Sequence, residues 1–333
     1  MNTNQDLSLS IVITSYTTER LHDIYELLES IKNQTYKNME TVYVIEGSEE
    51  LKDEINTFIM EKSIPNIQVI FCSEKLGICA ARNLGIRHAK GTIVAFTDDD
   101  AVLPPEWAEE ILNTFDDEMI IGATGPATPL WENTPVPWFP QEFYWMLGCT
   151  DWVENDKRQP IRGAFGVNMS FRKEAFETCR FSENLGISEG ANRSGKVGLL
   201  VDDLEFSLRV RHATKKTIIY NPKLKVQHKV YEYRLTRQFI RKQAYWQGYS
   251  KAILKKFYGK GSQKEQLIGT EYRMLRRILF KLVPSTLKKS LSQPTRAWKT
   301  LKVIMFVLYH VSIGYVSGSM SLIGTLTRES YST

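Results

Sequence analysis

Strand-like and helix-like segments alternate four times within the first 97 residues, and this alternation limits the possible folds more than any other feature. Apolar runs rich in β-branched residues predict buried strands at residues 9–14, 41–45, 67–72 and 92–97. Helical spacing of apolar residues predicts helices between them, at residues 21–33, 49–62 and 77–89. Because the connections are short, the pattern predicts βαβ units, and so a Rossmann-like α/β domain with a mostly parallel sheet flanked by helices.

Polar or acidic residues follow three of these four strands. Thr14 and Ser15 follow the first strand, Glu46 the second and Asp98 the fourth. Ligands of such sheets bind beyond the carboxyl ends of the strands. We therefore expect these side chains to line a site.

The run Asp98-Asp99-Asp100 is the densest acidic feature at this edge. Three carboxylates at one strand end repel one another, and a divalent cation would relieve the repulsion and bridge a phosphate ligand. The run could instead cap the helix expected after Pro104, where the helix dipole favours negative charge. Taken alone, the run leaves both interpretations open.

Several sequence strings together resemble the family-2 glycosyltransferases with the GT-A fold. They occur in the expected order at residues 10–16, 30–36, 44–48, 76–85 and 96–100. The resemblance implies a GT-A catalytic domain over residues 8–232. It also implies transfer of a sugar from a nucleotide-diphosphate donor, with a divalent cation, Mn²⁺ or Mg²⁺.

The resemblance assigns nucleotide contacts to the first two strand ends. The backbone around Thr14 and Ser15 would cradle the base. The family's second strand usually ends in Asp-Asp-Gly-Ser, whereas this chain has Ile45 and Glu46 before Gly47 and Ser48. Glu46 can accept a hydrogen bond from the same N–H of a uracil, so a UDP-linked sugar is the favoured donor. The replacement of the family's aspartate by Glu46 affects the residue that would recognise the base, so it leaves the choice of nucleotide less certain.

The resemblance also assigns the residues around the diphosphate. Asp98 would contact the ribose or uracil, Asp99 belongs to the same donor site, and Asp100 would be the main metal ligand. Arg82 would lie near the nucleotide or form a structural salt bridge. His228 falls where many GT-A enzymes have a histidine that binds metal or diphosphate, although a lone histidine is often structural.

A second acidic cluster, Asp202, Asp203 and Glu205, begins a predicted helix. It resembles the family's acidic pair before a helix, in which an aspartate is the catalytic base. Inverting transfer needs a carboxylate that removes the proton of the acceptor hydroxyl. Asp203 fits that role best and Asp202 second; capping of the helix would explain one carboxylate but not three.

Two further regions are expected to contact the acceptor. Gly163 and Asn168 lie in a glycine-containing stretch that resembles the family's acceptor side, and glycine permits close approach to a ligand. Arg237, Arg241 and Trp246 mix positive charge with aromatic rings. This part resembles an archaeal branch that includes the glucosyl-dolichyl-phosphate glucuronosyltransferases of protein N-glycosylation, which implies a lipid-linked phosphate sugar as acceptor.

The C-terminal part is strongly basic. From residue 229 onward the chain has 20 Lys and Arg against 4 Asp and Glu, whereas the whole chain has 43 and 38. Such an excess suits anionic lipid or nucleic acid. The apolar segment 303–326, long enough to span a bilayer, favours lipid over nucleic acid.

We therefore expect residues 233–333 to form a basic helical region that associates with the membrane. Segments 274–283 and 287–299 mix apolar and basic residues as membrane-surface helices do. Segment 303–326 would insert from one side or span once. If it spans, Lys299 and Lys302 would keep its N-terminal side in the cytoplasm, so the predicted location is the cytoplasmic face of the cell membrane.

Two alternatives remain open from the sequence. The same chemistry could act on a polysaccharide or another glycan that carries no lipid. The chain could also be a membrane-docked module that binds sugar nucleotides without turnover.

Overall fold

The computed structural model describes residues 7–133, 136–150, 156–183, 201–258 and 264–321. The chain forms two compact units. The first unit consists of the described residues within Met1–Leu130, Cys149–Gly198 and Asp202–Lys229. The second unit consists of the described residues within Trp131–Gly148, Leu199–Val201 and Val230–Thr333. The sheet and the acidic clusters belong to the first unit, and the basic helices to the second.

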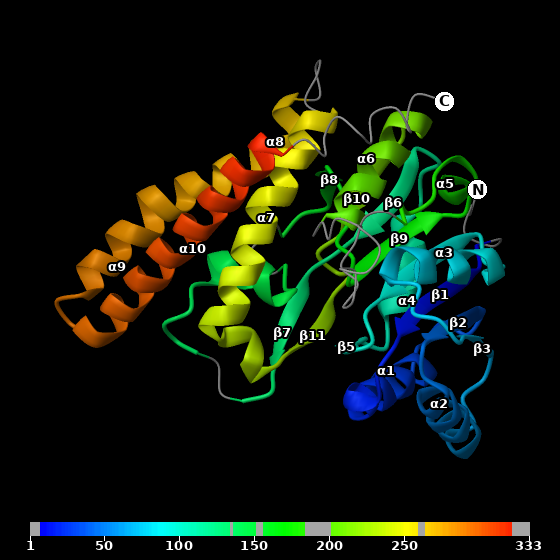
Figure 1. Ribbon diagram of the computed structural model, residues 1–333. Helices are drawn as coiled ribbons and strands as arrows, with labels where there is room; N and C mark the ends of the chain where they lie inside the picture. Colours follow the sequence, from blue (N-terminus) through cyan, green and yellow to red (C-terminus); the bar gives the residue numbers. More distant parts are fainter. Residues whose placement is uncertain (1–6, 134–135, 151–155, 184–200, 259–263, 322–333) are drawn as a thin grey trace. The chain divides into compact units, whose positions relative to one another are not determined.

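An eight-stranded sheet in the order β3-β2-β1-β4-β9-β6-β10-β8 forms the centre of the first unit (Figure 1). Its strands are β1 Leu9–Ser15, β2 Met39–Glu46, β3 Ile67–Cys72, β4 Ile93–Thr97, β6 Ile120–Thr124, β8 Gln159–Ile161, β9 Asn168–Arg172 and β10 Thr217–Tyr220. The first four strands pair in parallel, as do β6 and β10, whereas β9 and β8 run antiparallel to their neighbours. The predicted α/β fold with a mostly parallel sheet is confirmed.

The helices of the first unit follow the strands as the sequence predicted. They are α1 Leu21–Lys32, α2 Glu49–Lys62, α3 Ile78–His88, α4 Trp107–Thr114, α5 Glu174–Thr178 and α6 Asp202–Thr214, with a short 3-10 turn, η1, at Thr18–Arg20. A second sheet has the order β5-β11-β7 and consists of β5 Ala101–Val102, β11 Val226–Val230 and β7 Ala127–Trp131. Because β5 lies three residues after β4, this small sheet is held at the carboxyl end of β4.

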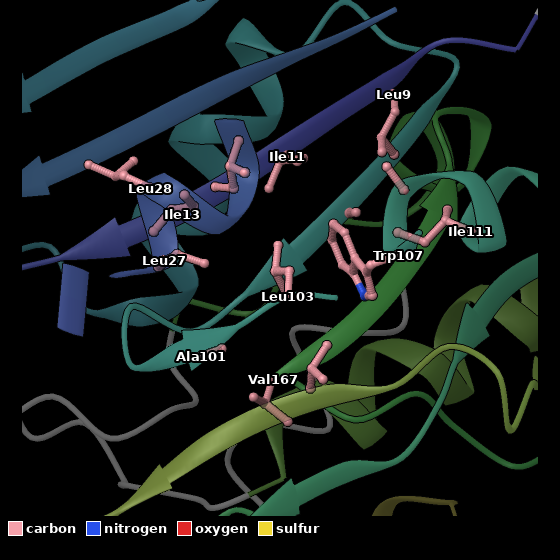
Figure 2. Close-up of a cluster of buried hydrophobic side chains, with 14 of the residues drawn as sticks. Leu9, Ile11, Ile13, Leu27, Leu28, Ala101, Leu103, Trp107, Ile111 and Val167 are labelled. Carbon is pink, nitrogen blue, oxygen red and sulfur yellow. The ribbon is translucent and has the colours of Figure 1, made fainter. Parts of the chain in front are cut away.

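A hydrophobic core covers one face of the large sheet. Alternate residues of β1 point into it, because side chains along a strand point to opposite faces in turn: Leu9, Ile11 and Ile13 belong to this core, whereas Val12 faces a second apolar cluster on the other side. Trp107 of α4 is 1% exposed and packs in the same core (Figure 2). Full burial of each such side chain stabilises the fold by about 1.5–3 kcal/mol, which fixes the register of the strand ends.

The second unit is mainly helical. Its elements are the 3-10 helices η2 Gln141–Leu147 and η4 Glu232–Leu235, the helices α7 Arg237–Tyr258, α8 Lys264–Arg277, α9 Val283–Lys289 and α10 Pro294–Met320, and a π-helical turn, η5, at Ile278–Leu282. Segment 287–299, expected as one surface helix, is divided instead, because α9 ends at Lys289 and Pro294 begins α10. Proline is favoured in the first turn of a helix and disfavoured inside one.

Helix α10 contains most of the predicted apolar segment. It is long and apolar enough to cross a membrane by length and composition, with a mean hydropathy of 1.5 in its most apolar window. Residues 322–326 of the predicted segment lie outside the described residues.

Candidate active site

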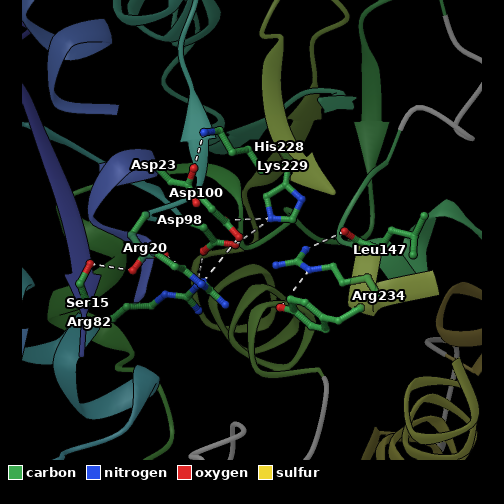
Figure 3. A network of polar contacts seen from close by, with 12 residues as sticks. Ser15, Arg20, Asp23, Arg82, Asp98, Asp100, Leu147, His228, Lys229 and Arg234 are labelled. Carbon is green, nitrogen blue, oxygen red and sulfur yellow. Dashed lines mark hydrogen bonds and ion pairs between the residues drawn. The ribbon is translucent and has the colours of Figure 1, made fainter. Parts of the chain in front are cut away.

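The first acidic run forms the connection between β4 and β5, where it meets a histidine from a distant part of the sequence. Strand β11 pairs antiparallel with β5 and brings His228 opposite Ala101. The His228 Nε2 lies 3.1 Å from the Asp100 Oδ1 and 4.0 Å from the Asp98 Oδ2 (Figure 3). One ligand atom from each of Asp98, Asp100 and His228 lies within 4.8 Å of the other two.

This trio suits a divalent cation. It offers two carboxylates and one imidazole, the donor set that Mn²⁺ and related metals accept, and two like charges in close proximity would be stabilised by a cation. Asp100 and His228 are 1% and 2% exposed, whereas Asp98 is half-buried. Metal binding by Asp100 and His228 stays a prediction; the structure places beside them Asp98, which the family resemblance assigned to the nucleotide.

Asp99 lies between two members of this trio in the sequence but is held by other partners. Its Oδ2 accepts a hydrogen bond from the Ser15 Oγ at 2.8 Å, and its Oδ1 accepts one from the Arg20 Nη1 at 3.1 Å. Burial, and then the charge of Asp100, raise the pKa of Asp99 to about 6. The Ser15 Oγ also lies 2.9 Å from the Tyr43 hydroxyl. The side chains of Ser15 and Asp99 therefore brace the ends of β1 and β4, and half-buried Thr14 lies beside them on β1.

Sequence reasoning missed Arg20. Its Nη1 pairs with Asp99 and also lies 3.5 Å from the Asp100 Oδ2, so it partly neutralises two members of the acidic run. Its position was a usable indication, since η1 follows the carboxyl end of β1, the edge at which such sheets bind ligands.

Arg82 of α3 joins the two acidic clusters. Its Nη1 lies 2.7 Å from the Asp202 Oδ2, and its Nη2 lies 3.6 Å from the Asp98 Oδ1. The guanidinium is 5.5 Å from the centre of the Phe181 ring, and the residue is 5% exposed. Burial lowers the pKa of Arg82 while Asp202 and then Asp98 raise it, and the net shift is upward. The structure therefore includes the salt bridge that the sequence offered as one interpretation.

Asp203 is the second residue of α6, and its carboxylate is held by the backbone. Its Oδ2 accepts from the Gly166 N–H at 2.9 Å, and its Oδ1 accepts from the Leu204 N–H at 2.6 Å. Burial, and then the charge of Asp202, raise the pKa of Asp203 to about 6. A carboxylate with this pKa is ionised at neutral pH and holds a proton more tightly than an ordinary aspartate, as a general base requires.

Glu46 is buried at the end of β2. Its Oε2 accepts from the Gly77 N–H at 2.8 Å and also from the Leu76 N–H, both just before α3. One side-chain oxygen therefore fixes the loop that leads to α3. Its contact with a nucleotide base stays a prediction.

The two residues predicted on the acceptor side of the first unit pack within the protein. The Asn168 Oδ1 accepts from the Trp107 Nε1 at 3.0 Å, and its Nδ2 donates to the Leu224 carbonyl at 2.6 Å. A Cβ on Gly163 would lie 2.8 Å from the Leu204 Cδ1, so this glycine lets its loop approach α6. Their acceptor contacts stay predictions.

The remaining predicted acceptor residues lie on α7 in the second unit. Arg237 is exposed, and its guanidinium lies 5.2 Å from the Phe306 ring centre. Arg241 is also exposed, and the Trp246 ring packs edge-on against Tyr245 and Tyr249. Acceptor binding by Arg237, Arg241 and Trp246 stays a prediction.

Comparison of the sequence with known proteins identifies relatives of this arrangement. Residues 10–180 match the family described as Glycosyl transferase family 2. The chain is 29% identical over 321 residues to the glucosyl-dolichyl phosphate glucuronosyltransferase of Haloferax volcanii, and the match covers 95% of this chain and 97% of that protein.

Solved structures share the fold. The mannosyltransferase PcManGT from Pyrobaculum calidifontis, in complex with GDP-Man and Mn²⁺, superposes with a TM-score of 0.62 at 17% identity, over 93% of this chain and 87% of that one. GalNAc-T7 with UDP, GalNAc and Mn²⁺ gives a TM-score of 0.54 at 15% identity, over 84% and 58% of the two chains. At these identities the likeness supports the GT-A fold alone.

Proposed function

Since this chain belongs to glycosyl transferase family 2, we propose that it moves a sugar, with inversion, from a nucleotide-diphosphate donor to a lipid-linked phosphate sugar. The favoured donor is a UDP-linked sugar. The reaction takes place at the cytoplasmic face of the cell membrane.

One observation carries this proposal: Arg82 contacts both a metal-ligand residue and the cluster that contains the base. It pairs with Asp98 of the trio and with Asp202, the neighbour of Asp203. A donor diphosphate and an acceptor hydroxyl need these two kinds of group close to each other, because one bond breaks as the other forms.

The trio would hold the cation, either Mn²⁺ or Mg²⁺. Bound by Asp98, Asp100 and His228, such an ion supplies Lewis-acid stabilisation of the diphosphate leaving group. Both solved relatives named above contain Mn²⁺. The remaining donor contacts are the predicted ones, with the backbone at Thr14 and Ser15 and the carboxylate of Glu46 around the base.

Asp203 would act as the general base. The acceptor hydroxyl oxygen attacks the anomeric carbon from the face opposite the leaving group, the bond from that carbon to the diphosphate oxygen breaks, and the hydroxyl proton moves to an Asp203 carboxylate oxygen. The Gly166 and Leu204 N–H groups hold that carboxylate in one orientation. Arg82 offsets the charge of Asp202, so that the base cluster and the donor's negative charge can coexist.

The lipid-linked acceptor rests on two supports. The relative from Haloferax volcanii, aligned over almost its whole length, is named for a dolichyl phosphate substrate. The second unit adds basic helices and an apolar helix, which suit an acceptor delivered at a membrane. An acceptor phosphate would find positive charge at Arg237 and Arg241.

A transfer assay tests the proposal. Purified protein with Mn²⁺ is given a panel of UDP- and GDP-sugars, with either a polyprenyl-phosphate monosaccharide or the same sugar without lipid. We expect transfer from one UDP-sugar to the lipid-linked acceptor, and loss of transfer in Asp100→Asn. Equal use of the lipid-free acceptor would favour a polysaccharide enzyme, and donor binding without any transfer would favour a module that lacks turnover.

A further inference from the structure

Helix α10 has two apolar faces on opposite sides, and the described residues of the protein cover only one of them. The buried face consists of residues spaced alternately by three and four: Ala297, Thr300, Ile304, Val307, Val311, Gly314 and Gly318, of which Val311 is partly exposed. The exposed face, here called the outer stripe, consists of Trp298, Lys302, Met305, Tyr309, Ile313, Val316 and Met320. Each outer residue lies two positions from a buried one, about 200° around the helix.

The buried face packs closely on α7 (Figure 1). A Cβ added at Gly314 would lie 1.9 Å from the Tyr245 carbonyl oxygen, and one at Gly248 would lie 2.0 Å from the Val311 carbonyl oxygen. The two backbones therefore touch where only glycine fits. Polar contacts reinforce the pair, since the Lys255 Nζ donates to the Tyr315 hydroxyl at 3.0 Å.

This pairing makes a membrane span costly. The two helices run in the same direction, because Arg237 lies over Phe306 and Tyr245 contacts Gly314. Arg241 and Lys242, both exposed, fall between these two levels and so lie beside the middle of the apolar segment. If α10 spanned a bilayer while paired with α7, these two charges would enter the hydrocarbon core, where charge is least tolerated.

The outer stripe has the composition of a helix that lies in the membrane surface. Exposed apolar and aromatic side chains run along its length: Met305, Tyr309 and Met320 are 59%, 62% and 77% exposed. Positive charge accompanies them at Lys299 and Lys302. Aromatic and long apolar side chains insert at the boundary between headgroups and acyl chains, while lysines meet anionic headgroups.

The end of α9 and the turn before α10 continue this character. Leu287 and Leu291 are 52% and 90% exposed, and Lys288 and Lys289 are exposed between them. Apolar side chains interleaved with lysines match a surface that is both hydrophobic and negatively charged.

We propose that α10, the end of α9 and the turn between them dock in the plane of an anionic lipid bilayer, α10 through the outer stripe, and that α10 does not cross it. The high hydropathy of α10 is then explained by its two faces, because one packs on α7 and the opposite one contacts lipid. This deepens the proposed function by giving the mode of membrane attachment, yet it is tested without donor or acceptor, so it can fail while the transfer activity stands.

Vesicle binding gives the first test. The full-length protein is sedimented with vesicles of phosphatidylcholine alone or with vesicles that also contain about one-third phosphatidylglycerol. Urea unfolding of each variant, measured separately, checks that it is folded. We expect binding to the anionic vesicles, and about tenfold or more weaker partitioning for Met305→Ser/Met320→Ser, because two inserted side chains are lost. Lys288→Gln/Lys289→Gln should weaken binding by a similar factor on anionic vesicles only.

The matched control is Met60→Ser/Met119→Ser on the first unit, whose methionines are 78% and 53% exposed. It removes the same atoms from similarly exposed positions and should leave partitioning unchanged. Equal loss in both double variants, equal binding to neutral vesicles, or no binding by the unaltered protein would each overturn the proposal.

Depth measurement separates docking from spanning. In a Cys72→Ser background, single nitroxides are placed through Met305→Cys, Tyr309→Cys and Met320→Cys, and their depth in the bilayer is read from oxygen and nickel accessibility. Docking predicts the same shallow depth at all three. A depth maximum at Tyr309, near the bilayer centre, with a shallow Met320, would show a span and overturn the proposal.

Discussion

The two acidic runs of the first unit look alike in the sequence but are organised in opposite ways. In the first, Asp98 and Asp100 converge with His228 on a common point. In the second, each carboxylate has its own partner: Arg82 for Asp202, the Gly166 and Leu204 N–H groups for Asp203, and Arg209 for Glu205 at 2.7 Å.

The difference shows what each run can do. Arg20 and Arg82 offset only part of the repulsion between the converging carboxylates of Asp98 and Asp100, and a cation would offset more of it, so the first run is suited to binding a cation. Carboxylates that are held separately can be tuned one at a time, so the second run can include a single base with a raised pKa.

Asp203→Asn should lower kcat about 10²–10⁴-fold, the range associated with loss of a general base, and leave donor binding within about threefold. Asp202→Asn should cost less than about tenfold, because Asp202 pairs with Arg82 and is not held by the backbone as Asp203 is. Steady-state transfer kinetics and calorimetric donor binding measure both. A larger loss in Asp202→Asn would move the base to that residue.

Arg82→Gln should destabilise the fold by about 3 kcal/mol, because it leaves Asp98 and Asp202 facing each other without the cation that separates them. The matched control is Arg158→Gln, which breaks an exposed pair with Asp116 and should cost about 1 kcal/mol or less. Urea unfolding of both variants gives the comparison. Equal losses would mean that Arg82 does not couple the two runs.

His228→Gln should weaken Mn²⁺ binding about tenfold or more, since a ligand is removed from the convergent run. His22→Gln is the control, because that histidine is exposed and pairs with Glu26 along one helix turn, away from the acidic run. Electron paramagnetic resonance of free Mn²⁺ measures both affinities. An unchanged affinity in His228→Gln would remove the histidine from the metal site.

The pH dependence of kcat should show an acid limb near pH 6, since the pKa of Asp203 is raised to about 6 and only its ionised form accepts a proton. Activity is then lost as pH falls through 6. In Asp202→Asn the acid limb should move to lower pH, because the negative charge of Asp202, the second cause of the raised Asp203 pKa after burial, is removed. The same raised pKa means that ionised Asp203 opposes folding above about pH 6, and this effect fades as pH falls toward 4. A limb that does not move in Asp202→Asn would contradict the coupling.

Local pattern predicted much of the fold. The bounds of α2 and β3 agree with the predicted segments, and those of β1, α1 and β4 differ by one residue. Such segments are readable because burial on one face imposes a period of 2 or 3.6 on nearby residues. The break between α9 and α10 was not predicted, because the apolar and basic residues of segment 287–299 suggested one helix although Pro294 lies inside it.

The candidate site was predictable only as a set of residues. Strand ends and the resemblance selected Asp98, Asp100, Asp203 and His228, but not which atoms face one another. The inward turn of Asp99, the contact of Arg20 with two of the carboxylates, and the use of Asn168 to hold Trp107 all depend on pairs far apart in the sequence.

The alternation of elements, the order of the two acidic runs and the excess of positive charge after residue 229 can be read along the chain, because each is a property of neighbouring residues. The convergence of one run, the division of the other and the two opposite faces of α10 depend on tertiary contacts. The pairing of β5 with β11 brings His228 to residues more than a hundred positions earlier, and the close approach of Gly248 to Val311 and of Gly314 to Tyr245 sets which side of α10 remains exposed. Long-range register of this kind follows from the packing of the whole core, which no local stretch of sequence contains.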